Sequence, residues 1–294
     1  MRYLITGGSG FLGTALSQAL IDQGHRVAIT SRDPEHCDVP KGVQARHLDR
    51  LSPTDYFDVV INLAGLPIAD QRWSDERKYE LRRSRLDTTQ ALMDWLQAVI
   101  QKPQVLISGS AIGFYGAQGE TELTEKSAPQ HEFVHQLCED WEERAKIAAD
   151  LNIRTVLLRT GIVLHPAGGM LKRVLKPFKL GLGGRLGNGQ QWMSWISLED
   201  WVRAVLFLIE HSEARGAFNL VAPNPVRNLS FTQQLSQTLK RPTLMPLPAW
   251  LLQLVFGEMS GLLLDSQRVL PERLLGLGFE FKHPTLQGAL AEVV

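Results

Sequence analysis

The stretch that decides the fold of this 294-residue chain reads Thr6-Gly7-Gly8-Ser9-Gly10-Phe11-Leu12-Gly13. Its glycines have the spacing Gly-x-x-Gly-x-x-Gly, between a predicted strand at Tyr3–Thr6 and a predicted amphipathic helix at Phe11–Gln23. Such glycines allow a tight turn, leave the backbone bare enough for a pyrophosphate to approach, and let the helix pack closely on the strand. The helix N-terminus then offers unpaired N–H groups to the phosphates.

This context predicts a dinucleotide site and disfavours the alternative, a glycine-rich turn with no ligand. The residues that we expect to contact the cofactor in this loop are Gly7, Ser9, Gly10, Phe11, Leu12 and Gly13.

The rest of the first half alternates short β-branched runs with longer amphipathic segments, which is typical of βαβ units. Further strands are predicted at Arg26–Thr30, Val43–Arg46, Val59–Leu63, Val105–Ser108 and Thr155–Leu158. Further helices are predicted at Ser74–Ala98 and Glu132–Asp150. With right-handed crossovers, these elements give an α/β fold with a Rossmann-type, doubly wound parallel sheet.

A smaller C-terminal lobe is expected to follow. After Arg159 the alternation weakens, and the glycine-rich run 181–189 predicts irregular backbone. A helix near Leu198–His211 and a strand near Phe218–Val221 are expected to return to the sheet. The predicted nucleotide-binding domain is therefore 1–165, completed by about 195–222. Segments 166–194 and 223–294 are assigned to the lobe that would hold the substrate.

Composition excludes several classes of protein. The 31 basic and 31 acidic residues cancel, which leaves no electrostatic footprint for nucleic acid or an anionic membrane, so we expect neither partner. Two cysteines, Cys37 and Cys138, make neither a disulfide framework nor a metal pair; we expect no metal, and a reducing cytoplasm fits best. The longest apolar runs, such as Ala249–Phe256, fall well short of the roughly 18 residues that span a bilayer. Because a strand is predicted directly after Met1, we expect no signal segment.

The residues that follow the second strand select the dinucleotide. An acidic residue there would bind the ribose 2′-hydroxyl of NAD, but this chain has Ser31 and then Arg32. A guanidinium can clamp a 2′-phosphate with paired hydrogen bonds, whereas a carboxylate repels it. The sequence predicts NADP(H), bound by Ser31 and Arg32. The alternative is that Arg32 is a solvated surface residue and Asp33 takes the acidic role.

The loop at 6–13 also resembles that of the extended short-chain dehydrogenase/reductases, the nucleotide-sugar epimerase/dehydratase group. Asn62-Leu63-Ala64-Gly65 is similar to that family's Asn-Ala-Ala-Gly element, which lines the cofactor, so Leu63, Ala64 and Gly65 are expected to do so. In the resembled fold the next helix runs beside the cofactor, which makes Glu80 and Arg85 candidates to line the site. The alternative for both is an ordinary charged helix face.

The family's catalytic pair, Tyr-x-x-x-Lys on the helix after the fifth strand, is absent. If Glu142 matches the family's following glutamate, Val134 replaces the tyrosine and Cys138 replaces the lysine. Losing a positioned general acid typically costs about 10²- to 10⁴-fold in rate, so the usual reductase or epimerase mechanism is not expected. The departure resembles the atypical, epimerase-like subgroup related to cell-division-inhibitor-like proteins. Similarities include Trp73, Leu158-Arg159-Thr160-Gly161, Trp195-Ile196, Asp200 and Gly278-Phe279.

Three side chains are candidates for substitute chemistry. Ser110, in a segment similar to the family's serine-bearing one, is placed to hydrogen-bond a substrate oxygen, and Tyr115 is a candidate proton donor. His135 is the third candidate, because histidine is the side chain that most often transfers protons in enzymes, although a lone helical histidine is usually exposed. Structural roles compete with each: a loop hydrogen bond for Ser110 and a core position for Tyr115. Cys138 is expected to be a small buried hydrophobe.

Two functions follow. The first is an NADP(H)-dependent oxidoreductase or epimerase with rearranged acid–base groups, acting on an unknown small molecule. The second is a non-catalytic NADP(H)-binding regulatory or sensor protein with an apolar partner surface on the C-terminal lobe. Residues 250–256 would form that surface, unless they form the core of the lobe. A sugar-nucleotide epimerase proper would need the missing tyrosine and tightly held NAD. A homodimer through helices of the main domain is common in the resembled family.

Overall fold

A computed structural model describes all 294 residues of the chain, and a seven-stranded parallel sheet lies at its centre. The strands are β1 (Arg2–Thr6), β2 (Arg26–Thr30), β3 (Gln44–Arg46), β4 (Val59–Asn62), β5 (Val105–Ala111), β7 (Arg154–Thr160) and β11 (Gly216–Leu220). They pair in the order β11-β7-β5-β4-β1-β2-β3. Because the strand order reverses between β1 and β4, the carboxyl ends of these two strands form the crevice where such sheets bind ligands. The predicted doubly wound sheet is confirmed.

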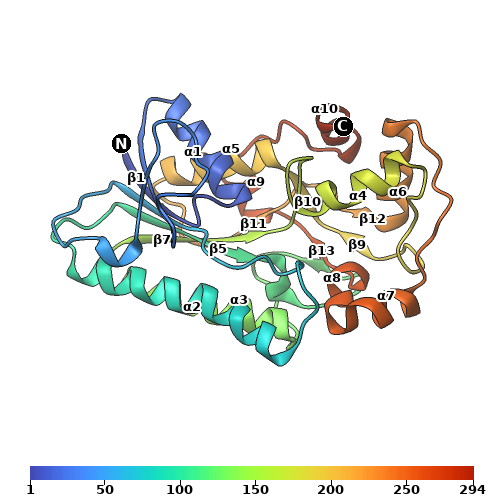
Figure 1. The fold of residues 1–294 in the computed structure, drawn as a ribbon, viewed down its shortest axis with the longest axis horizontal. Coiled ribbons are helices and arrows are strands. Elements are labelled where there is room, and N and C mark those ends of the chain that lie inside the picture. The colour runs from blue at the N-terminus through green and yellow to red at the C-terminus, as the bar shows by residue number, and fades with distance from the viewer.

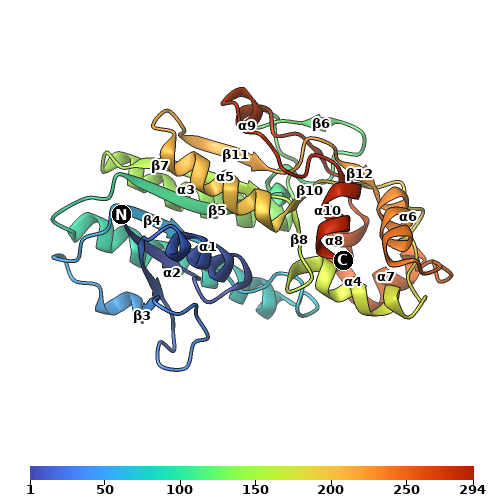
Figure 2. The same ribbon diagram turned by 90° about the horizontal axis from the view of Figure 1, so that it is seen from above.

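Helices cover both faces of the sheet (Figures 1 and 2). They are α1 (Phe11–Asp22) and α5 (Leu198–Glu210) on one face, and α2 (Asp75–Ala98) and α3 (Phe133–Asp150) on the other. Their bounds agree with the predicted helices to within one residue. None of the chain's helices has both the length and the hydropathy that crossing a membrane demands.

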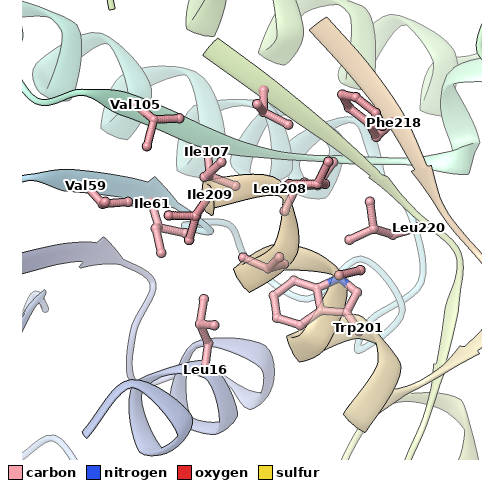
Figure 3. Packing of buried hydrophobic residues seen from close by; sticks show 14 of the residues in the cluster. Leu16, Val59, Ile61, Val105, Ile107, Trp201, Leu208, Ile209, Phe218 and Leu220 are labelled. Atoms are coloured by element: carbon pink, nitrogen blue, oxygen red, sulfur yellow. The ribbon is translucent and has the colours of Figure 1, made fainter. Parts of the chain in front are cut away.

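Apolar residues pack on both faces of the sheet because its strands are buried on both sides. On the face of α1 and α5, Leu16, Ile61, Ile107, Trp201 and Leu208 belong to one core of 24 residues, and each is fully buried (Figure 3). On the other face, residues of α2 and α3 pack against Leu4, Val60 and Leu106 in a core of 14 residues. The sheet is thus held rigidly, and the loops at its carboxyl edge start from fixed positions.

Strand β5 extends three residues beyond its predicted end at Ser108. The apolar pattern stops there, but Gly109, Ser110 and Ala111 still pair with Leu158, Arg159 and Thr160 of β7. A Cβ on Gly109 would lie 2.7 Å from the Trp141 ring of α3, so only glycine lets that helix pack this closely. The extension carries Ser110 to the carboxyl edge of the sheet.

The C-terminal lobe is built from short elements. Its strands are β9 (Trp192–Met193), β12 (Val226–Arg227) and β13 (Arg268–Val269), the last pairing with β6 (Glu122–Leu123). The paired strands β8 (Ile162–Leu164) and β10 (Trp195–Ser197) lie between the lobe and the main domain, because Leu164 and Trp195 enter the lobe core whereas Val163 and Ile196 enter the main core. Its helices are α4 (Gly169–Lys179), α6 (Asn228–Leu239), α7 (Ala249–Phe256), α8 (Gly261–Leu264) and α10 (Leu286–Val293). A separate core around Phe178, Trp195 and Phe231 holds the lobe together. In the glycine-rich run, Gly181, Gly187 and Gly189 have positive φ, which confirms the predicted irregular backbone.

One segment that the sequence assigns to the lobe returns to the sheet. Helix α9 (Glu272–Gly276) lies beside β11 (Figure 2), and Leu274 and Phe279 are buried in the α1/α5 core. Within the segment 223–294 that the sequence assigns to the lobe, these two side chains thus pack in the core of the main domain. The sequence shows that Leu274 and Phe279 are apolar, but it does not show which of the two cores they enter.

The buried Asp200 of α5 binds the backbone of the residues that follow this segment. Its Oδ1 accepts the Lys282 N–H at 2.8 Å, and its Oδ2 accepts the His283 N–H at 2.8 Å. The carboxylate is fully buried, and it is the acceptor for both backbone N–H groups.

Asp200→Ala should therefore lower the free energy of unfolding. Each orphaned N–H costs about 1–3 kcal/mol, so a loss of about 2–6 kcal/mol is expected in urea denaturation. The exposed carboxylate of Glu213 serves as the control, because Glu213→Ala should change stability by less than about 0.5 kcal/mol. Equal effects of the two variants would contradict this role for Asp200.

Candidate functional site

A cleft of about 880 Å³ opens at the carboxyl ends of β1, β2 and β4. That volume is in the range of small-molecule and cofactor sites. Eight of the predicted cofactor residues line it: Gly7, Ser9, Gly10, Ser31, Arg32, Leu63, Ala64 and Gly65. The other five do not: Phe11, Leu12, Gly13, Glu80 and Arg85.

The glycine loop is shaped by close contacts of its backbone. Gly7 has a φ of +70°, and a Cβ there would lie 2.7 Å from the carbonyl carbon and oxygen of Leu63. A Cβ on Gly13 would lie 2.4 Å from the Gly7 oxygen. Gly13 thus serves the packing of α1 on the loop and not the lining of the cleft. Because the N-cap Gly10 has no side chain to cap α1, the first N–H groups of the helix remain free for a ligand.

Phe11 points away from the cleft, toward the C-terminal lobe. A Cβ on Gly168 would lie only 2.3 Å from the Phe11 ring. The ring centroids of Phe11 and His165 are 6.1 Å apart. Phe11 therefore contacts the segment that leads into α4.

The end of the cleft beside β2 carries cationic and hydroxyl side chains. Ser31, Arg32 and His47 all line it. Ser31 Oγ accepts the Asp33 N–H at 3.1 Å, which leaves its own proton free to donate. The Asp33 carboxylate is 3.0 Å from His36 Nδ1 and does not line the cleft. The alternative in which Asp33 faces the ribose therefore lacks support, although two other carboxylates, Asp49 after β3 and Asp87 of α2, do line the cleft.

A stripe on α2 forms the wall opposite the glycine loop, and the sequence reasoning missed it. The lining residues of this helix are Ser84, Asp87, Thr88, Ala91, Trp95 and Ala98. They recur every three or four positions, the spacing of one helix face, so this periodicity could have found them. Glu80 lies one turn earlier, half-exposed, and pairs with Arg77 at 2.9 Å. The loop after β4 covers that turn, since Arg77 also donates to the Pro67 carbonyl.

Buried polar groups tie the strands together beneath the cleft. Asn62 at the end of β4 accepts from Thr6 Oγ1 at 2.6 Å and donates to Thr89 Oγ1 of α2 at 2.9 Å. Trp141 Nε1 of α3 donates to the same Thr89 oxygen at 3.1 Å. These bonds join β1, β4, α2 and α3 at one point and keep the two helices in register with the sheet.

A second buried network contains both predicted catalytic residues. Ser110 Oγ donates to Glu142 Oε1 at 2.7 Å, and Arg159 binds both Glu142 oxygens, at 2.8 and 2.9 Å. Arg159 also donates to Tyr115 Oη at 3.1 Å, and Tyr115 donates to Asn219 Oδ1 at 2.7 Å. Burial raises the pKa of Tyr115 above its ordinary value. The structure thus brings Ser110 and Tyr115 together, but both hydroxyl protons are donated inside the protein and neither residue lines the cleft.

Val134 and Cys138, the residues expected in place of the catalytic pair, lie against the turn Ile112–Tyr115. A Cβ on Gly113 would be 3.3 Å from Val134 Cβ and 3.8 Å from Cys138 Sγ. Burial raises the pKa of Cys138 to about 11, so the side chain remains a thiol, as expected of a small buried hydrophobe.

The expectation that His135 is exposed is wrong. The side chain is fully buried, and Nδ1 donates to the Phe114 carbonyl at 2.7 Å. The first turns of α3 pack on the turn at 112–115, which covers the ring; sequence alone could not show this contact.

The chain is similar to known proteins over nearly its whole length. Residues 3–220 match the family described as NAD dependent epimerase/dehydratase, and residues 247–293 match a domain of unknown function, DUF1731. An epimerase family protein of Mycobacterium bovis is 41% identical over 292 residues, covering 97% of this chain and 95% of that protein. The chloroplastic SDR39U1 homolog of Arabidopsis thaliana is 34% identical, covering 100% and 87%.

Solved structures are similar to this chain as well. The crystal structure of human epimerase family protein SDR39U1 (isoform 2) with NADPH has a TM-score of 0.92 and 34% identity, and it covers 100% of this chain and 99% of that one. A UDP-galactose 4-epimerase structure has a TM-score of 0.78 at 18% identity, covering 100% and 97%, which shows a shared fold.

Gly13→Ala should damage the cleft without touching its lining. The new Cβ would overlap the Gly7 oxygen, so α1 must shift, at a cost of about 1–3 kcal/mol. Thermal unfolding and nucleotide binding should both be weakened. Gly276→Ala is the control, since no atom lies within 4 Å of a Cβ there. A Gly13→Ala protein as stable as wild type would show that the loop tolerates the shift.

Proposed function

This chain belongs to the NAD-dependent epimerase/dehydratase family, and we propose that it binds NADPH in the cleft and acts as an oxidoreductase on a small molecule held by the C-terminal lobe. The observation that carries the proposal is the pair Ser31 and Arg32 lining the end of the cleft beside β2, with Asp33 turned away toward His36. The human relative crystallised with NADPH supports the choice of cofactor.

The residues present fit this cofactor. The bare backbone at Gly7 and Gly10 and the uncapped start of α1 suit a pyrophosphate, and Arg32 suits a 2′-phosphate. When bound, NADPH would supply a hydride to an electrophilic carbon. The backbone at Leu63–Gly65 and the α2 stripe hold the dinucleotide between them. Neither Val134 nor the buried Cys138 thiol offers a phenol beside a cation, so we infer that the proton needed by the product comes from water or from the substrate.

A second function is favoured by a different observation. Trp250, Leu254 and Val255 of α7 are 65%, 67% and 53% exposed, while Leu252 is buried in the lobe at 4%. Trp250 and Leu254 are one turn apart and Val255 is next to Leu254, so the three lie on an outer face of the helix, where an apolar partner surface was expected. A regulatory protein that reports NADP(H) occupancy to a protein partner would need such a surface and would not need the missing tyrosine and lysine.

NADPH should bind more tightly than NADH, and Arg32→Ala should abolish the difference. Loss of a charge-assisted hydrogen bond of about 1.5–3 kcal/mol corresponds to about 10- to 100-fold in Kd. Calorimetric titration of the cofactor-stripped protein with both nucleotides measures this. Arg50→Ala, an exposed residue that does not line the cleft, is the control. Binding of neither nucleotide by wild type would refute the proposed function.

Turnover separates the two functions. An oxidoreductase should consume NADPH, followed by absorbance, with at least one carbonyl compound or sugar nucleotide in a panel, and Ser110→Ala should slow that reaction because it disturbs Glu142 and Arg159. Tight NADPH binding with no consumption across the panel would instead favour the regulatory protein.

A further inference from the structure

The charge of this chain is unevenly distributed along its length. Segments 166–194 and 223–257 of the C-terminal lobe contain eight of the 31 basic residues, five in the first and three in the second, and none of the 31 acidic residues. The rest of the chain therefore carries an excess of eight acidic residues. The net charge of zero, from which the sequence predicts no anionic membrane partner, is thus the sum of a basic region in the lobe and an acidic remainder.

This basic region includes one end of the molecule. Residues 180–187 run beside residues 243–247, since the Leu247 N–H donates to the Arg185 carbonyl at 2.9 Å, and α7 follows directly. In both ribbon views α4, α6 and α7 lie together at one end of the molecule, and the N-terminus lies toward the other end (Figures 1 and 2). We call residues 180–187 and 243–247 together with α7 the apolar tip.

The apolar tip exposes an unusual number of large apolar side chains. Eight of the fourteen such side chains that are exposed in this protein belong to it. They include Leu180 and Leu244, which are 65% and 72% exposed, and also Trp250 and Leu254 of α7. A gathering of exposed apolar side chains with polar neighbours indicates a surface that binds a protein or a membrane.

Unpaired cations flank the apolar tip. Lysines recur every three or four positions on the exposed face of α4, opposite the side chains that this helix buries in the lobe core, and the last of them directly precedes residue 180. Two more cations end α6 and directly precede residue 242. Six exposed basic side chains of this region form no ion pair within the protein: Lys172, Lys176, Lys179, Arg185, Lys240 and Arg241.

The kind of cation favours a lipid surface over a protein partner. Four of the six are lysines, and lysine is depleted in protein–protein interfaces relative to the rest of a protein surface. An anionic bilayer instead attracts every lysine and arginine near it. Tryptophan is also enriched at the level of the lipid headgroups, where its ring is partly apolar and partly polar in its contacts.

We propose that the apolar tip attaches this protein to the surface of a bilayer that contains anionic lipids. Trp250 and Leu254 enter the boundary between headgroups and acyl chains, and the six cations bind lipid phosphates around them. The same surface repels the acidic remainder of the chain, which orients the protein with its lobe toward the membrane. No residue of the apolar tip lines the cofactor cleft, so the attachment needs no NADPH and goes beyond the proposed oxidoreductase activity.

Flotation with lipid vesicles tests the apolar part of the surface. Wild type should bind vesicles of mixed phosphatidylglycerol and phosphatidylcholine at least tenfold more tightly than vesicles of phosphatidylcholine alone. The double variant Trp250→Ser with Leu254→Ser should weaken binding to the mixed vesicles at least tenfold, because two side chains no longer enter the lipid. Ile100→Ser is the matched control, since Ile100 of the main domain is 74% exposed, and it should bind like wild type.

A second double variant tests the cations. Lys240→Gln with Arg241→Gln should weaken binding to the mixed vesicles about 10- to 30-fold, because each charge near an anionic surface contributes about fivefold. High salt should reduce this difference. Arg26→Gln with Lys41→Gln removes the same charge from exposed positions of the main domain and should have little effect.

Three results would overturn the proposal. They are a wild type that does not bind the mixed vesicles, binding that both tip variants retain, and equal weakening by the tip variants and their controls. A wild type that ignores vesicles but forms a dimer in sedimentation, lost in Trp250→Ser with Leu254→Ser, would identify a second copy of the chain as the occupant instead. Thermal unfolding and NADPH titration of every variant should match wild type, because the substituted side chains are exposed and none lines the cleft.

Discussion

The close approach of two strand ends at Gly7 is the constraint on which the rest of this structure depends. With a φ of +70°, Gly7 brings the backbone after β1 against the Leu63 carbonyl after β4, where no Cβ has room. That contact sets the floor of the cleft at the point where the strand order reverses. It also brings Thr6 within hydrogen-bond distance of Asn62, whose amide then reaches Thr89 of α2. The loop, the strand ends and the helix wall are therefore positioned together.

The polar groups under the cleft are of two kinds. In the Ser110–Glu142–Arg159–Tyr115 network every charge is paired and both hydroxyl protons are donated inward, which suits a rigid support. Arg85 differs, because its guanidinium is only partly buried and donates to the Leu81 and Leu66 carbonyls without forming an ion pair. A buried network in which every group is paired stabilises the fold.

The two lobes are joined more closely than a simple division of the chain implies. Leu274 and Phe279 enter the main core, and Asp200 holds the backbone of Lys282 and His283 before α10 completes the lobe. The chain thus passes between the lobes several times. Phe11 of the glycine loop meets Gly168 at the entrance to α4, so the cofactor loop and the lobe share a contact.

The sequence by itself determined the sheet, its main helices and the glycine loop, because these depend on local periodicity and on backbone positions that only glycine can occupy. It also pointed to eight residues that line the cleft, and to Val134 and Cys138 in place of the catalytic pair. Only the tertiary structure decided that Glu80 turns toward Arg77, that His135 is buried, and that the protons of Ser110 and Tyr115 are donated inward. Apart from the Glu80–Arg77 pair, these outcomes depend on contacts between residues far apart in the chain, such as Tyr115 with Asn219. Helical spacing places a side chain on a face, but the partner across that face comes from another element, and it decides whether the side chain meets solvent, core or ligand.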